Sequence, residues 1–356
     1  MLVAALIVSP APAVADVAPG YKVYVANSGR DFNGNTGPHN IAIFSVRADG
    51  GLTPFGQPVP TGAGARALEF SGRFGYLAAL EENAVYAYTR DPSGGLTPLA
   101  RVGAGGEAPF GLAVAPDGKS LYTANSGDDT VSRFKLVDGV PVLAETVSTE
   151  QSGVRNVIVS RDGRFLFVSH GAPDSAGPDP LVVFPITGGG LGSPSHVVLI
   201  GGGGFDMAST PDGQFLYVAC AGTNDVFALS IGPYGALTVL GRFPAPRTPE
   251  GLSITPDGRR IFVTSVASQP VSNPAEAGVW TFTIERDGTL TRQGPRVGSG
   301  IGPGVAAPDG THLFTGDFFQ STMSAFDIAT GVPREIADSP YPSRGLAPGF
   351  DGVTVR

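Results

Sequence analysis

Short apolar runs and polar turns alternate along this chain in a unit that recurs seven times. Each unit contains an apolar run, a tight turn, a second apolar run and a polar loop. The glycines of successive tight turns lie 46, 45, 50, 45, 52 and 42 residues apart. A unit of this length has room for about four short strands and their turns, so the pattern predicts repeated four-stranded β-sheets. The tight turns are Ser71-Gly72, Asp117-Gly118, Asp162-Gly163, Asp212-Gly213, Asp257-Gly258, Asp309-Gly310 and Asp351-Gly352.

The apolar runs have the composition of β-strands. They are rich in Val, Leu, Ile, Phe and Tyr, which pack well on a pleated sheet. A second turn, such as Asp287-Gly288, precedes the fourth strand of most units, and its glycine supplies the positive φ that a short hairpin needs. The first strands are expected to begin near Ala67, Gly111, Asn156, Asp206, Gly251, Gly304 and Gly345.

The two ends of the chain predict how the repeat closes. The chain enters at a second strand, Val23–Asn27, and ends with a spare first strand, Gly345–Phe350. Pairing these fragments completes one sheet and closes a ring, whereas an open solenoid would cap its ends. We therefore predict an all-β fold: a seven-bladed β-propeller with four antiparallel strands per blade, closed by pairing of the C-terminal strand with the N-terminal blade. Residues 353–356 have no assigned partner.

Composition and charge fit a single turn-rich domain over residues 21–356. The 356 residues include 52 glycines and 32 prolines, yet 42% of the chain is hydrophobic, which argues against disorder. The formal net charge of −8 argues against a nucleic-acid partner, which would require a basic surface. The lone Cys220 excludes an intramolecular disulfide.

The N-terminus resembles an export signal. Residues 2–8 form a short apolar stretch, and Ala13-Val14-Ala15 is a small-x-small cleavage site. The sequence therefore predicts a signal peptide over residues 1–15 and a secreted or extracytoplasmic protein. No Lys or Arg precedes Lys22, so either the start lies upstream or the signal is atypical. The apolar stretch is far shorter than the roughly 20 residues that span a bilayer, so the protein is not expected to be membrane-spanning.

One face of the predicted ring carries the irregular loops. In a four-stranded meander the tight turns lie on one face, and the loops after the second and fourth strands lie on the other. Three loops after second strands are enlarged: Ser28–Asn40, Gly171–Pro180 and Val266–Gly278. Long loops on a rigid scaffold are where binding sites usually occur, so this face is the expected site; neutral insertion is the alternative.

Two sequence features resemble a known family. Leu121-Tyr122-Thr123-Ala124-Asn125 with Ser126-Gly127 resembles the repeat of the YVTN propellers. Turns of the form Asp-Gly-x-Leu-Thr, as at Asp287–Thr291, resemble those of the lactonase-like seven-bladed propellers, the 6-phosphogluconolactonase and carboxymuconate cyclase family. The resemblance covers the chain from about Lys22 to its end. It implies a propeller that opens or closes cyclic esters without a metal or other cofactor.

The family's site residues can be compared position by position. Its arginine lies just before a first strand, and the corresponding positions here are Arg66, Phe110, Arg155, Phe205, Glu250, Pro303 and Arg344. The neighbouring histidine is matched in no unit, and the segment around Arg66 has Ala67 in its place. No unit has an acid at the position of the family's glutamate either, although Glu81 and Glu82 lie one and two residues from that position.

The arginines are the strongest binding candidates. Arg66, Arg155 and Arg344 are expected at the loop-bearing mouth of the central channel, where guanidinium groups would attract a carboxylate or phosphate. In the alternative interpretation they pair with mouth acids such as Glu250, Asp206, Glu107 or Asp317.

The ends of the second strands supply the remaining candidates. His170 is a candidate acid–base group, with a structural role as the alternative, and Glu81 is the other candidate. Asn125, Glu250 and Asp317 are candidate substrate-binding residues.

Two functions remain open from the sequence. One is an exported lactonase-like enzyme (a carboxylic ester hydrolase or cycloisomerase) acting on a small anionic cyclic ester, with no cofactor and no metal. The other is a secreted, non-catalytic propeller that binds a small anionic ligand or a protein partner. The unmatched histidine and glutamate positions favour the second, and the resemblance with the arginine cluster favours the first.

Overall fold

The computed structural model describes residues 20–30, 34–188, 190–265, 278–298, 302 and 304–356. The predicted signal peptide and most of the enlarged loop Val266–Gly278 lie outside these residues. Over the described part of the chain, no helix has the length and hydropathy needed to cross a membrane.

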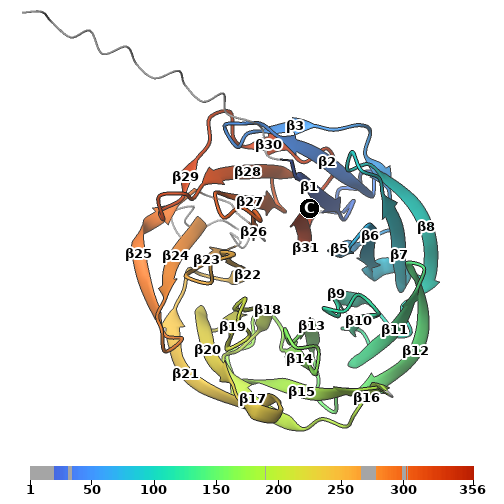
Figure 1. Cartoon of the computed structure of the whole chain (residues 1–356), viewed down its shortest axis with the longest axis vertical. Coiled ribbons are helices and arrows are strands. Elements are labelled where there is room, and N and C mark those ends of the chain that lie inside the picture. Colours follow the sequence, from blue (N-terminus) through green and yellow to red (C-terminus); the bar gives the residue numbers. More distant parts are fainter. Residues whose placement is uncertain (1–19, 31–33, 189, 266–277, 299–301, 303) are drawn as a thin grey trace, which may run out of the picture.

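The strands form antiparallel meanders arranged around a common centre (Figure 1). The two short 3-10 helices are η1 (Leu80–Glu82) and η2 (Pro233–Gly235). The first half of the chain contains β1 (Lys22–Asn27), β2 (Asn40–Val46), β3 (Leu52–Pro54), β4 (Val59–Pro60), β5 (Ala65–Ser71), β6 (Phe74–Ala79), β7 (Ala84–Arg90), β8 (Leu96–Gly103), β9 (Pro109–Val114), β10 (Ser120–Asn125), β11 (Thr130–Val137), β12 (Val140–Ser148), β13 (Val154–Val159), β14 (Phe165–His170), β15 (Asp179–Thr187) and β16 (Gly190–Leu191).

The second half continues the same order of strands. Its members are β17 (His196–Ile200), β18 (Gly204–Ser209), β19 (Phe215–Cys220), β20 (Asp225–Ile231), β21 (Leu237–Pro244), β22 (Pro249–Ile254), β23 (Arg260–Ser265), β24 (Gly278–Ile284), β25 (Leu290–Val297), β26 (Gly304–Ala306), β27 (His312–Asp317), β28 (Thr322–Asp327), β29 (Arg334–Glu335), β30 (Tyr341–Pro342) and β31 (Pro348–Val355).

Each meander runs from the centre outward. The strands β5, β9, β13, β18, β22, β26 and β31 lie nearest the centre in Figure 1, and strands such as β8, β12, β21 and β25 lie at the rim. This arrangement confirms the predicted all-β fold and is consistent with a β-propeller. The first strands begin two residues before the predicted positions in five of the units, because a buried residue such as Ala65 lies at each observed start.

The C-terminal strand pairs with the N-terminal one, as predicted. β31 runs antiparallel to β1 through Val25↔Val353 and Val23↔Val355. The predicted limits of this strand are wrong, because it spans Pro348–Val355 and includes the expected Asp351-Gly352 turn and most of the residues left without a partner. The cause is the alternation of Val353 and Val355, which bury their side chains in one core cluster with β1 and β27.

The core lies between neighbouring sheets. Val25 of β1 packs with Phe314 of β27 on one side, and Tyr24 packs on Phe70 of β5 on the other, with ring centroids 4.7 Å apart. The Tyr24 hydroxyl donates to the carbonyl oxygen of Gly94 in the next meander, at 2.8 Å. Every sheet is therefore held by apolar contacts on both faces, and the inner strands are fixed in position around the centre.

Candidate functional site

Two of the three predicted arginines converge at the loop-bearing end of the centre. Arg66 and Arg155 each follow the first residue of an inner strand, β5 and β13. Both face Phe110 of β9, with guanidinium carbons 5.6 Å and 4.7 Å from its ring centroid. Equivalent positions on β5 and β13, the inner strands that flank β9 in the chain order, thus place both cations against one aromatic ring.

Further aromatic rings enclose these cations. The Arg155 guanidinium lies 5.3 Å from the ring centroid of Phe205, and that of Arg66 lies 5.9 Å from the ring centroid of Phe318. Phe110 and Phe205 meet edge to face at 5.5 Å. Burial lowers the pKa of Arg66 to about 10, because the charged form loses solvation among these rings. Aromatic faces partly replace that solvation.

A buried carboxyl group completes this arrangement. Glu250 of β22 is 6% exposed, and its Oε2 has no hydrogen-bond partner among the described residues. Burial raises the pKa of Glu250 to about 8, although Arg155 and Arg66 act in the opposite direction. Its carboxyl group is therefore mostly protonated near neutral pH. The set is called the mouth cluster below: Arg66, Phe110, Arg155, Phe205, Glu250 and Phe318.

Arg344 does not join the mouth cluster, so its predicted position is wrong. It precedes β31 by four residues, has a φ of 63°, and donates from Nη1 to the carbonyl oxygen of Gly56 at 2.9 Å. The equivalent position on the closing strand belongs to Gly349, where a Cβ would lie 2.7 Å from the carbonyl oxygen of Arg66. The error came from starting the last inner strand at Gly345.

His170 is part of the scaffold. It is the last residue of β14 and has 0% exposed surface. Its Nδ1 lies 3.1 Å from the carbonyl oxygen of Pro180, and its Nε2 lies 3.0 Å from Thr149 Oγ1. Burial lowers the pKa of His170. Both ring nitrogens are engaged and no surface is open to a substrate, so this geometry favours the structural alternative, and the acid–base role of His170 stays a prediction.

Asn125 is also a structural residue. It is fully buried at the end of β10, and its Nδ2 donates to Thr130 Oγ1 at 3.0 Å and to Ser132 Oγ at 2.9 Å. These bonds join β10 to β11, so the predicted substrate-binding role of Asn125 does not fit the structure.

Glu81 and Asp317 differ in accessibility. Glu81 lies in η1 and is exposed. Its charge partly offsets the effect of burial, which lowers the pKa of Arg66. Asp317 is 6% exposed and accepts hydrogen bonds from the backbone of Phe319 and Gln320, both at 2.9 Å. Burial raises the pKa of Asp317 to about 6. Glu81 thus remains available to a ligand, and Asp317 holds the turn that carries Phe318.

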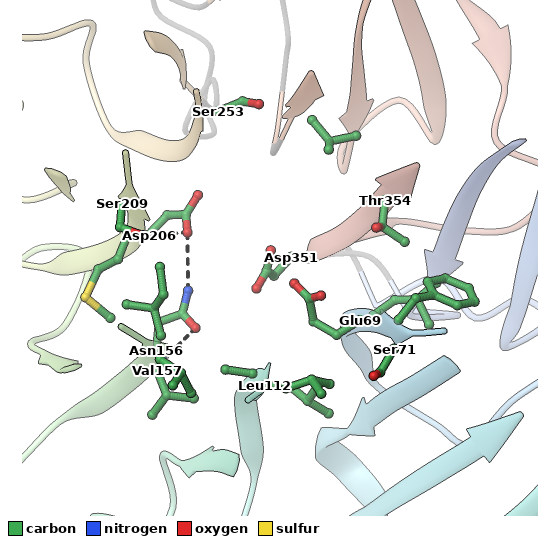
Figure 2. Close-up of a pocket in the computed structure, with 18 of the residues that line it drawn as sticks. Glu69, Ser71, Leu112, Asn156, Val157, Asp206, Ser209, Ser253, Asp351 and Thr354 are labelled. Carbon is green, nitrogen blue, oxygen red and sulfur yellow. Dashed lines mark hydrogen bonds between the residues drawn. The ribbon is translucent and has the colours of Figure 1, made fainter. Parts of the chain in front are cut away.

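A cavity of about 630 Å³ occupies the centre toward the tight-turn end (Figure 2). Three carboxyl groups from separate inner strands point into it: Glu69 of β5, Asp206 of β18 and Asp351 of β31. The sequence pattern did not predict this group, although Asp206 was expected as a possible acid partner of the mouth arginines. We call it the channel cavity; its charged lining residues are Glu69, Arg161, Asp206, Asp351 and Arg356.

The carboxyl groups of the channel cavity resist ionisation. Burial raises the pKa of Asp206 to about 7, even though Leu252 N donates to Oδ2 at 2.7 Å. Burial, with the neighbouring Asp206 and Glu69, also raises the pKa of Asp351. Asn156 Nδ2 donates to Asp206 Oδ1 at 3.3 Å, so Asp206 is not the partner of the mouth arginines. Within the described residues, no group of three or more His, Cys, Asp or Glu side chains is arranged to hold a metal ion.

Comparisons with known proteins agree with this architecture. A family model described as "Lactonase, 7-bladed beta-propeller" matches residues 37–177. The 6-phosphogluconolactonase of Enterobacter sp. (strain 638) is 24% identical over 230 residues, and that of Cronobacter sakazakii is 26% identical over 236 residues. Each match covers 61% of this chain, and the matches span 66% and 65% of the relatives, slightly less than two thirds of their length.

Solved structures extend the likeness over most of the chain. A periplasmic gluconolactonase of Pseudomonas aeruginosa superposes with a TM-score of 0.75 and 19% identity, covering 94% of this chain and 98% of its own. A protein from Lactobacillus plantarum superposes with a TM-score of 0.74 at 19% identity and the same coverage. At this identity the superpositions establish the fold alone. Together the comparisons confirm that the chain resembles the lactonase-type β-propellers.

Proposed function

We propose that this protein opens small anionic lactones at the mouth cluster. The observation that carries the proposal is Glu250, a buried carboxyl group with an unpartnered oxygen beside two guanidinium groups. Buried polar atoms are normally satisfied, so a polar ligand is the natural partner for this oxygen. The names of the relatives, 6-phosphogluconolactonase and gluconolactonase, support a lactone derived from a sugar acid.

The proposed scaffold is a closed ring of seven blades. The support is the seven repeats of the sequence, the pairing of β31 with β1, and the coverage of the superposed structures. Closure matters for function because it brings Arg66 of β5, Arg155 of β13 and Glu250 of β22 to one axial opening.

The arginines would bind the charged parts of the substrate. Arg66 or Arg155 would hold its carboxylate or phosphate, and the other would stabilise the oxyanion that forms as water attacks the carbonyl carbon. A hydrogen bond to a charged group contributes roughly 1.5–3 kcal/mol, and more where water is excluded. The phenylalanines keep both cations in place before the substrate arrives.

The two acids would move the protons. Glu81, exposed near Arg66, would take a proton from the attacking water as the new carbon–oxygen bond forms. Glu250, protonated near neutral pH, would give its proton to the ring oxygen as the ester bond breaks. The product is the open hydroxy acid, and solvent returns a proton to Glu250.

A lactone panel tests this function. Purified protein is assayed with an anionic sugar lactone, such as 6-phosphogluconolactone, and with its uncharged counterpart. We expect hydrolysis of the anionic lactone, and a loss of about 10²-fold or more in kcat/KM for Arg155→Ala, because a transition-state contact is removed. The control is Arg164→Ala, an exposed arginine beside Phe165 that should leave kcat/KM unchanged.

A non-catalytic role is the second candidate function. It is favoured by one observation: His170, the only histidine predicted to act in catalysis, is locked in the scaffold. Absence of hydrolysis, together with binding of the hydroxy acid that Arg155→Ala abolishes, would replace the enzyme by a binding protein. Hydrolysis that is insensitive to Arg155→Ala would place the site elsewhere.

We also propose that the protein is exported. The support is the apolar stretch over residues 2–8 and the small residues Ala13 and Ala15. N-terminal sequencing of the protein recovered outside the cytoplasm should find Asp16 first. Recovery of the intact N-terminus only from the cytoplasm would contradict export.

A further inference from the structure

Four side chains of the mouth cluster occupy the same kind of backbone irregularity. On β22, Pro249 pairs with Ser265 and Gly251 pairs with Thr264. Glu250 between them is therefore the extra residue of a β-bulge. A bulge redirects a side chain while the strand continues, and bulges are frequent beside active sites. The residues at the four bulges are Phe110 of β9, Arg155 of β13, Phe205 of β18 and Glu250 of β22.

The residue two positions before each bulge has a left-handed backbone. Thr248, two residues before Glu250, has a φ of 50°, and Ala108, just before β9, has a φ of 49°. Neither is a glycine, and a β-branched residue such as Thr248 rarely adopts a positive φ because its Cβ crowds the backbone. The equivalent residues before β13 and β18 are Gly153 (φ 81°) and Gly203 (φ 68°). Strain of this kind persists only where neighbouring contacts hold it.

A residue of the preceding meander holds the strained Thr248. Asn224 Oδ1 accepts the backbone N–H of Thr248 at 2.7 Å, and the Asn224 carbonyl oxygen accepts the N–H of Ala245 at 3.0 Å. One residue thus fixes both ends of the loop that leads into β22. Asn224 has a φ of 57°, which asparagine tolerates better than most residues. We call this double contact the loop clasp; its equivalents join Asn83 to Ala108 (2.7 Å), Asp129 to Gly153 (2.7 Å) and Ser321 to Ala347 (3.0 Å).

The clasp before β13 makes two bonds from one side chain. Asp129 Oδ1 accepts the backbone N–H of Gly153 at 2.7 Å and that of Val154 at 3.2 Å. The carbonyl oxygen of Gly153 accepts the N–H of Gly171 at 2.8 Å, so the same residue is held from the other side as well. Arg155 follows directly after this fixed segment. Its starting direction is therefore set before its side chain meets the aromatic rings.

We infer that Asn224 and Asp129 are positioning residues of the mouth cluster, which act through Glu250 and Arg155. Each holds the chain two residues before a bulge, so a change at the clasp reaches the mouth side chain through a short, ordered segment. A displacement of about 1 Å can cost about 10²-fold in rate. The catalytic use of Glu250 and Arg155 rests on the proposed function, whereas their positioning rests on hydrogen bonds and backbone geometry.

Asn224→Gly isolates the clasp of Glu250. Glycine keeps the positive φ at residue 224 and the carbonyl bond to Ala245, but it removes the acceptor of the Thr248 N–H. We expect kcat/KM for an anionic lactone to fall about tenfold or more, mostly in kcat, because Glu250 is displaced while both arginines stay in place. Asn224→Asp keeps an acceptor oxygen and should remain within about threefold of the wild type.

The ionisation of Glu250 gives a readout that needs no turnover. Carbon-13 NMR of protein labelled at the glutamate carboxyl carbons follows this titration, and Glu250→Gln assigns the signal. The wild-type pKa of Glu250 should be about 8. In Asn224→Gly this pKa should be lower by about one unit or more, because a loosened start of β22 admits water to the carboxyl group. A purely structural clasp would leave the titration unchanged.

Ser321→Gly is the matched control. Its clasp holds Ala347, which has a φ of 55° and lies two residues before Gly349, a position that carries no side chain into the mouth. Ser321→Gly should lower the urea midpoint of unfolding by an amount similar to that in Asn224→Gly. The pKa of Glu250 should stay as in the wild type, and kcat/KM should stay within about threefold.

Thr248→Gly is a second variant that protects against loss of folding. It keeps the N–H donor and relieves the unfavourable φ, so its urea midpoint should lie close to that of the wild type. The added backbone freedom should still displace Glu250 and lower kcat. Unchanged kcat and an unchanged pKa of Glu250 in both Thr248→Gly and Asn224→Gly would overturn the positioning role.

The outcomes separate the two claims. Absence of hydrolysis by the wild type, with a lowered pKa of Glu250 in Asn224→Gly, would end the proposed function and support the positioning role. Hydrolysis by the wild type, with kcat/KM and the pKa unchanged in Asn224→Gly, would end the positioning role and keep the enzyme. Equal losses of kcat/KM in Asn224→Gly and Ser321→Gly would also overturn it, because the clasp would then act through stability alone.

Discussion

Buried polar side chains at the loop-bearing end divide into satisfied and unsatisfied groups. His170 has a partner on each ring nitrogen, whereas Glu250 has an oxygen without one among the described residues. The cost of burying a polar group depends on whether it is paired, so these residues have different roles. His170 stabilises the scaffold, and Glu250 lies where a ligand can complete its bonding.

His170→Gln should therefore affect stability and leave function intact. We expect the free energy of unfolding to fall by about 1–3 kcal/mol, because Thr149 Oγ1 and the Pro180 carbonyl lose well-placed partners. Urea unfolding measures the change, with His196→Gln as the control near the surface, expected within about 0.5 kcal/mol. Lost lactone hydrolysis at unchanged stability would restore a catalytic role for His170.

Neighbouring strand meanders are joined by recurring tyrosine bonds. Tyr217 of β19 donates its hydroxyl to the carbonyl oxygen of Gly288 at 3.0 Å, as Tyr24 of β1 does to Gly94. Gly288 has a φ of 83°, so the turn presents its carbonyl to the adjacent sheet. The same local geometry thus joins two different pairs of strand meanders.

Tyr217→Phe should weaken this junction. Loss of the bond to Gly288 is expected to lower the free energy of unfolding by about 1 kcal/mol, measured by urea denaturation. Tyr88→Phe is the matched control, because the buried Tyr88 hydroxyl has no hydrogen-bond partner among the described residues. Its removal should be neutral or stabilising. Equal effects of the two substitutions would show that the tyrosine bond contributes nothing specific.

The elements were predictable from sequence to different degrees. Alternation of apolar residues and Asp-Gly turns located most strands to within two residues, because local pattern and tertiary burial agree there. The closing strand was misplaced because Asp351-Gly352 has the composition of a turn but lies within β31. Because the last inner strand was predicted to begin too early, Arg344 was predicted at the position equivalent to Arg66 and Arg155. The sequence did not predict the channel cavity, because Glu69, Asp206 and Asp351 are far apart in the chain and approach one another only when the strands fold around the centre.

At the scale of the whole molecule, the closing strand faces a group of acids. Asp351 of β31 lies with Asp206 and Glu69 in the channel cavity, and the basic groups there are Arg161 and Arg356. Arg356 Nη2 lies 3.6 Å from Glu69 Oε2. The folded state raises the pKa of each of the three carboxyl groups, so it binds protons more tightly than the unfolded chain.

This coupling predicts that stability falls as the pH rises. The contribution of the three acids is fully present below their unfolded pKa of about 4 and is lost progressively up to about 7, the folded pKa of Asp206. Asp351→Asn, which stays neutral, should raise the free energy of unfolding by roughly 1–2 kcal/mol above pH of about 7 and change it little near pH of about 4. Urea unfolding at both pH values measures this. An equal effect at the two values would contradict the ionisation of Asp351 as the cause.

The central claim is that Glu250 transfers a proton during lactone opening at the mouth cluster. Its most direct test is the pH dependence of kcat/KM for an anionic lactone, corrected for spontaneous hydrolysis, in the wild type and in Glu250→Gln. The wild type should lose activity as the pH rises through about 8, since Glu250 then gives up its proton. Glu250→Gln should fall by about 10²-fold and lose that limb of the profile. A Glu250→Gln variant with wild-type kcat/KM and an unchanged profile would contradict the account.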